Sequence, residues 1–282
     1  MDFDKQISEI RALCGKLLEE NKVDVILAYG DGDLDDGTLI PLFIKSTDDI
    51  EKIKWGDRCW QNLAPYLHGR DDRTAIVAKA CDARAIVQYT IESQIERENV
   101  YVIGVDCPGM KDADGDPRPG CGECTVRVAP VCDTRIEDDR VAAISPVENS
   151  DSPAGSLKRF REEIDKCILC YSCRQACYGC YCPTCFIERD IPGWQPAEVD
   201  AGTKMTFHLG RSMHLAGRCV ECGACEAACA SGVNVRYVIK EATKFIEENY
   251  DFKTGMDPDT RQAMLTFKFD DKEIGFFGGG HE

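Results

Sequence analysis

The sequence predicts an α/β N-terminal domain, in which helices pack on a small parallel sheet, followed by an α+β, largely irregular domain. Apolar runs of strand length alternate with amphipathic helical patterns through the first third of the chain. Glycine, proline and cysteine then become frequent, and from residue 167 the cysteines recur at fixed spacing. We expect the first domain over residues 1–146, a linker over 147–156, the cysteine-rich domain over 157–250 and a C-terminal extension over 251–282.

Hydrophobic periodicity predicts the individual elements of both domains. In the first domain we expect helices over residues 3–22, 50–65 and 82–98, and strands over 23–29, 39–44, 74–79, 100–105 and 141–144. In the second we expect helices over residues 156–167, 203–217 and 233–249. The order strand, helix, strand over residues 74–105 predicts a right-handed parallel crossover. Cys14 and Cys59 stand alone on apolar helix faces and are expected in the core.

Two cysteine runs share the spacing C-x2-C-x2-C-x3-C. They consist of Cys167, Cys170, Cys173 and Cys177, and of Cys219, Cys222, Cys225 and Cys229. This spacing is that of two-cluster bacterial-type ferredoxins, in which the fourth cysteine of each run binds the cluster of the other run. We therefore assign Cys167, Cys170, Cys173 and Cys229 to one [4Fe–4S] cluster, and Cys219, Cys222, Cys225 and Cys177 to a second. Tyr178 and Ala230 replace the proline that usually follows each run, which removes no ligand.

A further group of cysteines lies at the irregular end of the first domain. Its members are Cys107, Cys121, Cys124 and Cys132, with Cys81 as a competing ligand. Cys107 ends a predicted strand, and strand ends with glycine-rich loops are where α/β folds place their sites. The sequence favours a further [4Fe–4S] cluster here, and plain structural thiols are the alternative.

Three more cysteines, Cys180, Cys182 and Cys185, directly follow the first run. They could belong to an additional metal site, either a third cluster or a tetrahedral zinc site. Such a site would need a fourth ligand. His214, His208 or a cysteine of the first domain could supply it. The alternative, equally supported by the sequence, is that these thiols pack beside the two clusters.

Composition excludes several functional classes. The 282 residues carry a net charge of −16, which would repel a phosphate backbone and argues against a nucleic-acid partner. Apolar runs stay shorter than the roughly 18 residues that a membrane span needs. The 18 cysteines at ligand spacing, together with an N-terminus that lacks a signal-peptide pattern, predict reduced thiols in an anaerobic-type cytoplasm.

Two segments carry a family resemblance, Ala78-Lys79-Ala80-Cys81-Asp82-Ala83-Arg84-Ala85-Ile86 and Val102-Ile103-Gly104-Val105-Asp106-Cys107-Pro108-Gly109. Over about residues 20–145 the chain resembles the beta-subunit family of coenzyme F420-reducing hydrogenase and F420-dependent formate dehydrogenase. The resemblance implies a domain that binds a flavin and a cluster and passes electrons between them. In that family the ferredoxin module usually precedes the α/β domain, whereas here it follows.

These observations favour an iron–sulfur electron-transfer subunit of a soluble multi-subunit oxidoreductase, linked to heterodisulfide reductase, formate dehydrogenase or hydrogenase. Its clusters would relay single electrons between other redox subunits. The alternative is an enzyme whose N-terminal domain binds FAD or F420 and transfers hydride itself. A structural zinc protein is disfavoured, because crossed ligand runs suit cubane clusters better than isolated tetrahedral sites.

Overall fold

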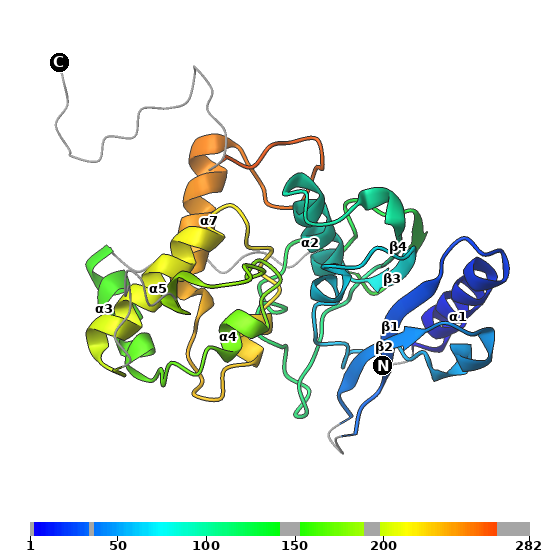
Figure 1. The fold of residues 1–282 in the computed structure, drawn as a ribbon. Helices are drawn as coiled ribbons and strands as arrows, with labels where there is room; N and C mark the ends of the chain where they lie inside the picture. Colours follow the sequence, from blue (N-terminus) through cyan, green and yellow to red (C-terminus); the bar gives the residue numbers. More distant parts are fainter. Residues whose placement is uncertain (1–2, 34–36, 142–152, 189–197, 264–282) are drawn as a thin grey trace.

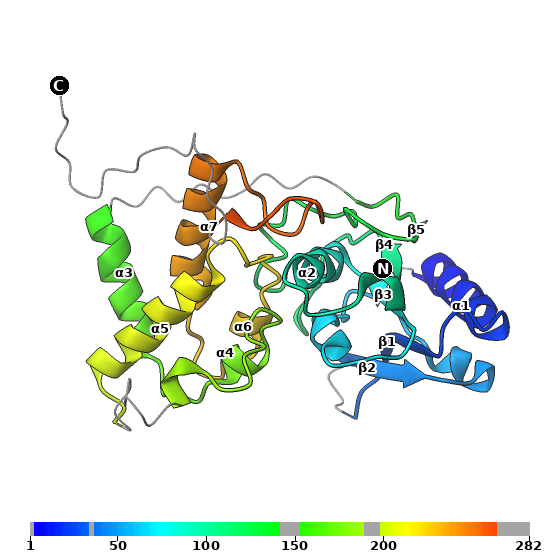
Figure 2. The same ribbon diagram turned by 45° about the horizontal axis from the view of Figure 1, so that its top comes forward.

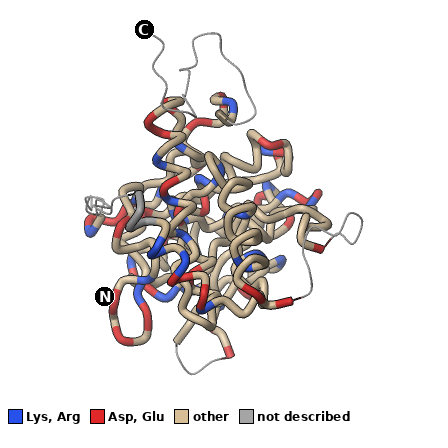
Figure 3. The backbone as a smooth tube through the Cα atoms, turned by 90° about the vertical axis from the view of Figure 1, so that its left-hand side faces the viewer, with Lys and Arg blue, Asp and Glu red and all other residues tan. Residues whose placement is uncertain are grey.

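The computed structural model describes residues 3–33, 37–141, 153–188 and 198–263. An α/β unit and a helical, cysteine-rich unit lie next to each other, with helix α2 (Ala80–Ile91) between them (Figure 1). Basic positions are interspersed with acidic ones along the backbone of both units (Figure 3). In the described part of the chain, no helix combines the length and the apolar character needed to cross a bilayer.

A mixed five-stranded sheet forms the centre of the α/β unit. Its strands are β1 (Val25–Asp31), β2 (Leu39–Ile44), β3 (Thr74–Ala78), β4 (Val100–Val105) and β5 (Thr134–Ile136), in the order β2-β1-β3-β4-β5. β2 is an antiparallel edge strand, and the other pairings are parallel. α1 (Asp4–Glu19) contacts β3 and β5, while α2 contacts β3 and β4, and the two helices lie on different sides of the sheet (Figure 2). The predicted parallel crossover, β3–α2–β4, is thus confirmed.

Burial explains why these segments form the sheet. All five residues of β3 are buried, as are the first six of β1, as expected for parallel strands covered on both faces. Cys14 and Cys59 are fully buried in the same core, which confirms their expected structural role. Burial raises the pKa of each thiol to about 12, so neither is reactive at neutral pH.

The expected helix over residues 50–65 is wrong. The segment contains two short 3-10 turns, η1 (Thr47–Lys52) and η2 (Ala64–Leu67), joined by irregular chain. The backbone N–H of Lys54 donates to Tyr29 O at 2.8 Å, so the segment bonds to the end of β1 instead of to itself. The expected helix 82–98 ends earlier than predicted, at Ile91. It also begins earlier, at Ala80, because the Asp82 carboxylate accepts a hydrogen bond from the Lys79 backbone N–H at 2.8 Å and caps its start.

The last strand also differs from expectation. β5 occupies Thr134–Ile136, whereas Val141 belongs to no strand and residues 142–144 lie outside the described chain. The short η3 turn (Arg97–Asn99) precedes β4. Pairing with β4 through parallel bonds extends the sheet, and a three-residue strand is too short to be seen in a hydrophobicity pattern.

Helices build the second unit. They are α3 (Pro153–Asp165), α4 (Ser172–Gln175), α5 (Ala201–Leu215), α6 (Ala224–Ala227) and α7 (Arg236–Tyr250), with η4 at Phe186–Glu188. α5 packs against α3 and α7, and α4 packs against α6. The three long helices were predicted, with ends displaced by a few residues. α3 begins inside the predicted linker, of which residues 147–152 lie outside the described chain.

Polar contacts fix the two units against each other. Arg218 and Glu92 form two hydrogen bonds of 2.5 and 2.7 Å, and Tyr181 donates to the same carboxylate at 2.6 Å. From α2, Arg84 donates to the carbonyl of Thr254 at 2.9 Å, which holds the chain after α7 against this helix. The cysteine-rich unit is therefore docked on α2 through buried groups.

Candidate iron–sulfur sites

The two cysteine loops, residues 167–177 and 219–229, have the same backbone course. Residues in the left-handed region recur at equivalent positions of the two loops, namely Leu169 (φ 54°) and Glu221 (φ 58°), and Tyr171 (φ 61°) and Gly223 (φ 73°). Leu169 N donates to Cys167 Sγ at 3.3 Å, and Glu221 N donates to Cys219 Sγ at 3.4 Å. Three of the four positions lack glycine, so both loops hold strained backbone that commonly marks a functional site.

The first predicted ligand set converges on one pocket. Cys167, Cys170, Cys173 and Cys229 all line it, although Cys229 comes from the second loop. Burial raises the pKa of Cys167, and the nearby Cys229 thiolate raises it further. Val233 N donates to Cys229 Sγ at 3.3 Å, as expected around a cluster thiolate.

The second predicted set is gathered in the same crossed manner. Burial raises the pKa of Cys222 to about 12, and the charges of Cys177 and Cys225 add to this effect. Burial likewise raises the pKa of Cys219, next to Cys225, Cys177 and Cys222. Cys177 comes from the first loop, so each loop brings its last cysteine to the other set. Neighbouring buried thiols suit a metal cluster, which deprotonates its ligands on binding.

Buried donors without protein acceptors test whether a cluster fits these pockets. His208 and Arg211 of α5 are each 4% exposed. His208 Nε2, and Nε and Nη1 of Arg211, have no hydrogen-bond partner in the described chain. His208 lines the pocket of the first set, and Arg211 lies among thiols of both sets. Cluster sulfides are acceptors of the kind that these donors lack, so the residues present fit [4Fe–4S] clusters.

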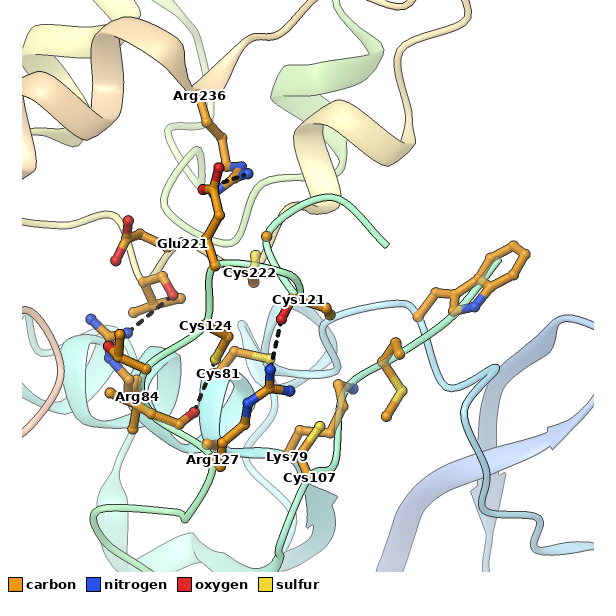
Figure 4. A pocket seen from close by; sticks show the side chains of 18 residues that line it. Lys79, Cys81, Arg84, Cys107, Cys121, Cys124, Arg127, Glu221, Cys222 and Arg236 are labelled. Atoms are coloured by element: carbon orange, nitrogen blue, oxygen red, sulfur yellow. Dashed lines mark hydrogen bonds and ion pairs between the residues drawn. The ribbon is translucent and has the colours of Figure 1, made fainter. Parts of the chain in front are cut away.

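Four cysteines of the first unit surround a third pocket. Cys81 in the first turn of α2, Cys107 after β4, and Cys121 and Cys124 of the knuckle loop (residues 119–124) line it (Figure 4). Cys222 of the second cysteine loop lines the same pocket. Of the predicted group, Cys132 alone is absent from this lining. Its side chain lies beside Gly104 of β4, where an added Cβ would come within 2.9 Å of Cys132 Cβ.

Basic side chains also face this third pocket, and the sequence did not single them out as part of a site. Lys79, Arg84, Arg127 and Arg236 line it. Lys79 is 2% exposed and pairs with Asp82 at 2.9 Å, while Arg127 donates to Cys121 O at 2.7 Å. Positive charge beside thiolates stabilises an anionic group. The position of Lys79 directly after a buried strand is the one feature of the sequence that indicated it.

The remaining cysteines do not gather around a fourth ligand. Cys182 and His214 are exposed, and the His214 ring packs on Phe186 with 5.3 Å between centroids. Among the residues described, no three His, Cys, Asp or Glu side chains are arranged to hold a single metal ion. Cys180 lies beside Cys177, and a hydrogen bond from that thiol lowers the pKa of Cys180 to about 7. The additional site over Cys180, Cys182 and Cys185 stays a prediction.

Comparison with known proteins gives the chain its relatives. No family model matches it. It is 21% identical, over 88% of its own length and 91% of the relative, to the F420-dependent formate dehydrogenase subunit beta of Methanocaldococcus jannaschii. The F420-dependent formate dehydrogenase 1 subunit beta of Methanococcus maripaludis is 35% identical over 36% of this chain. The matched segment covers about a quarter of that relative. Over most of its length the chain is thus similar to the beta subunit of an F420-dependent formate dehydrogenase.

Among solved structures, the chain matches one from the F420-reducing [NiFe] hydrogenase complex of Methanosarcina barkeri. The match has a TM-score of 0.33 and 19% identity, and it covers 39% of this chain and 43% of the other.

Proposed function

We propose that this protein is an iron–sulfur electron-transfer subunit of a multi-subunit oxidoreductase. One observation carries the proposal: each of the two cysteine loops brings its last cysteine to the set formed by the other loop. Spacing alone predicted this exchange, and it is the arrangement that two cubane clusters require. When bound, the clusters would supply one-electron redox chemistry, while the protein holds them, excludes water and sets their potentials.

Contact between the second set and the third pocket supports a continuous relay. Gly120 of the knuckle loop and Gly223 of the second cysteine loop touch backbone to backbone, and a Cβ on Gly223 would overlap Pro119 O. Cys222 belongs to the second set and also lines the third pocket. With a [4Fe–4S] cluster in that pocket, the second set would be the middle member of three adjacent centres.

The solvent-facing end of this relay is the first set. Cys170 is exposed, and Ile168 in the same loop is 59% exposed. The relatives are named as subunits of F420-dependent formate dehydrogenases. We therefore propose that this chain also works within a complex of redox subunits, and that one of them docks at the first cysteine loop.

Anaerobic purification and cluster analysis test the proposal. Three [4Fe–4S] clusters correspond to about twelve iron atoms and as many acid-labile sulfides per chain, with EPR signals after dithionite reduction. Cys121→Ser should lower the iron content by about one cluster and spare the two clusters of the cysteine loops. A colourless wild-type protein without iron would overturn the proposal, and unchanged iron in Cys121→Ser would remove the third centre from it.

The names of the relatives favour one alternative, hydride transfer that involves F420, and the family resemblance adds a flavin bound by this chain. A flavin absorbance band in the purified protein, together with turnover of a deazaflavin by the isolated chain, would support it. Full cluster content without either would leave the relay as the function.

A further inference from the structure

Arg211 is a buried cation that lies between the two crossed cysteine sets. It sits on α5, is 4% exposed, and donates from Nη2 to Cys173 O at 3.1 Å. Burial alone would lower the pKa of Arg211, but the charges of Cys177, Cys225, Cys180 and Cys173 raise it well above its usual value. Cys173 belongs to the first set, whereas Cys177 and Cys225 belong to the second. The guanidinium therefore faces ligands of both.

The charge of Arg211 has no carboxylate partner among the ion pairs of the described chain, unlike those of Arg236 and Arg218. Arg236 pairs with Glu226 at 2.8 Å and lies 3.7 Å from Glu123. Arg218 pairs with Glu92 at 2.5 Å. Burying an unpaired charge is strongly unfavourable. The structure therefore places Arg211 beside negative charge, which the thiolates of both sets and that of Cys180 supply.

We propose that Arg211 raises the reduction potentials of both crossed clusters. This inference rests on the proposed function. A reduction adds one electron and thus one negative charge to a cluster, and a nearby fixed positive charge favours that state. N–H donors directed at cluster sulfur act in the same sense.

The guanidinium stays protonated throughout, so electron transfer past Arg211 involves no proton transfer at this residue. Arg211 therefore acts on both clusters as a fixed positive charge.

Potentiometric titration of the holoprotein, followed by EPR, tests the proposal with two substitutions. Arg211→Gln removes the charge but keeps an N–H donor, and Arg211→Lys keeps the charge. We expect Arg211→Gln to weaken one-electron reduction of both clusters about tenfold, which is about 59 mV for one electron. The second-set cluster is identified as the one that persists in Cys170→Ser.

Lys244→Gln is the matched control, because it removes an exposed positive charge of α7 that pairs only with Glu248 among the ion pairs described. It should shift neither potential. Arg211→Lys should stay close to wild type. Unchanged potentials in Arg211→Gln with full iron would overturn the proposal, as would an equal fall in Arg211→Lys.

If Arg211→Gln binds less iron, Arg211→Lys decides alone. A wild-type potential with full iron supports the role of charge, and a tenfold weaker reduction overturns it. Failure of the proposed function would look different, since the wild-type protein would then carry no clusters to titrate.

Discussion

The two cysteine loops have one spacing and one backbone course, yet they occupy opposite environments. After the first cysteine, Ile168 is 59% exposed and Val220 is 2% exposed. At the second cysteine, Cys170 is exposed, whereas Cys222 lines the pocket shared with the knuckle loop. Local sequence thus specifies the backbone course of each cysteine loop, while packing of the rest of the chain decides which loop meets solvent and which meets the knuckle loop.

The largest effect should come from the cysteines at equivalent positions. Cys170→Ser and Cys222→Ser should each remove about four iron atoms, the content of one cluster. Cys222→Ser should additionally perturb the third pocket, which this residue lines, and so lose more iron than Cys170→Ser. Iron and sulfide analysis with thermal unfolding would measure this. Equal losses in both variants would contradict the shared position of Cys222.

Lys166 and Arg218, which directly precede the first cysteine of their loops, give a second matched pair. Arg218 forms the buried ion pair with Glu92, 15% and 5% exposed, whereas Lys166 pairs with Glu163 at the surface. Arg218→Met leaves a buried carboxylate unpaired and should lower the free energy of unfolding by about 4 kcal/mol. Lys166→Met should change it by less than about 0.5 kcal/mol. Similar values in chemical denaturation would show that the junction contributes little.

These pairs also explain how far the sequence predicted the molecule. The placement of three cysteines on each short loop follows from spacing, because it is a local property of the chain. The contact of Arg218 with Glu92 joins residues 126 positions apart, and no local pattern encodes it. The same holds for the segment over residues 50–65, where a bond from Lys54 to β1 overrode helical periodicity. Cys132 was grouped with Cys121 by proximity in sequence, but it packs beside β4 instead.

Gly223 and Tyr171 occupy the same position of the two loops, both in the left-handed region. Gly223 touches Pro119 so closely that a Cβ would overlap the carbonyl oxygen. Gly223→Ala combines this overlap with an unfavourable φ and should destabilise the protein by about 3 kcal/mol. Tyr171→Ala leaves the cost of the left-handed backbone unchanged and removes one edge-to-face contact with Phe207. It should lower the free energy of unfolding by about 1 kcal/mol. An unfolding free energy that is unchanged in Gly223→Ala would mean that the knuckle loop can move away.

The smallest difference in the free energy of unfolding is expected between alanine substitutions at Val220 and Ile168. One substitution should affect stability, and the other should affect electron transfer to a partner. Val220 packs in the core of the α/β unit, so Val220→Ala should lower the free energy of unfolding by about 2 kcal/mol. Ile168→Ala removes a side chain that is already largely in water and should leave it unchanged. If a redox partner docks on the first loop, Ile168→Ala should nevertheless slow electron transfer to that partner, which stopped-flow absorbance can follow. Val220→Ala should not slow it, because its side chain is buried in the core and away from the exposed first loop.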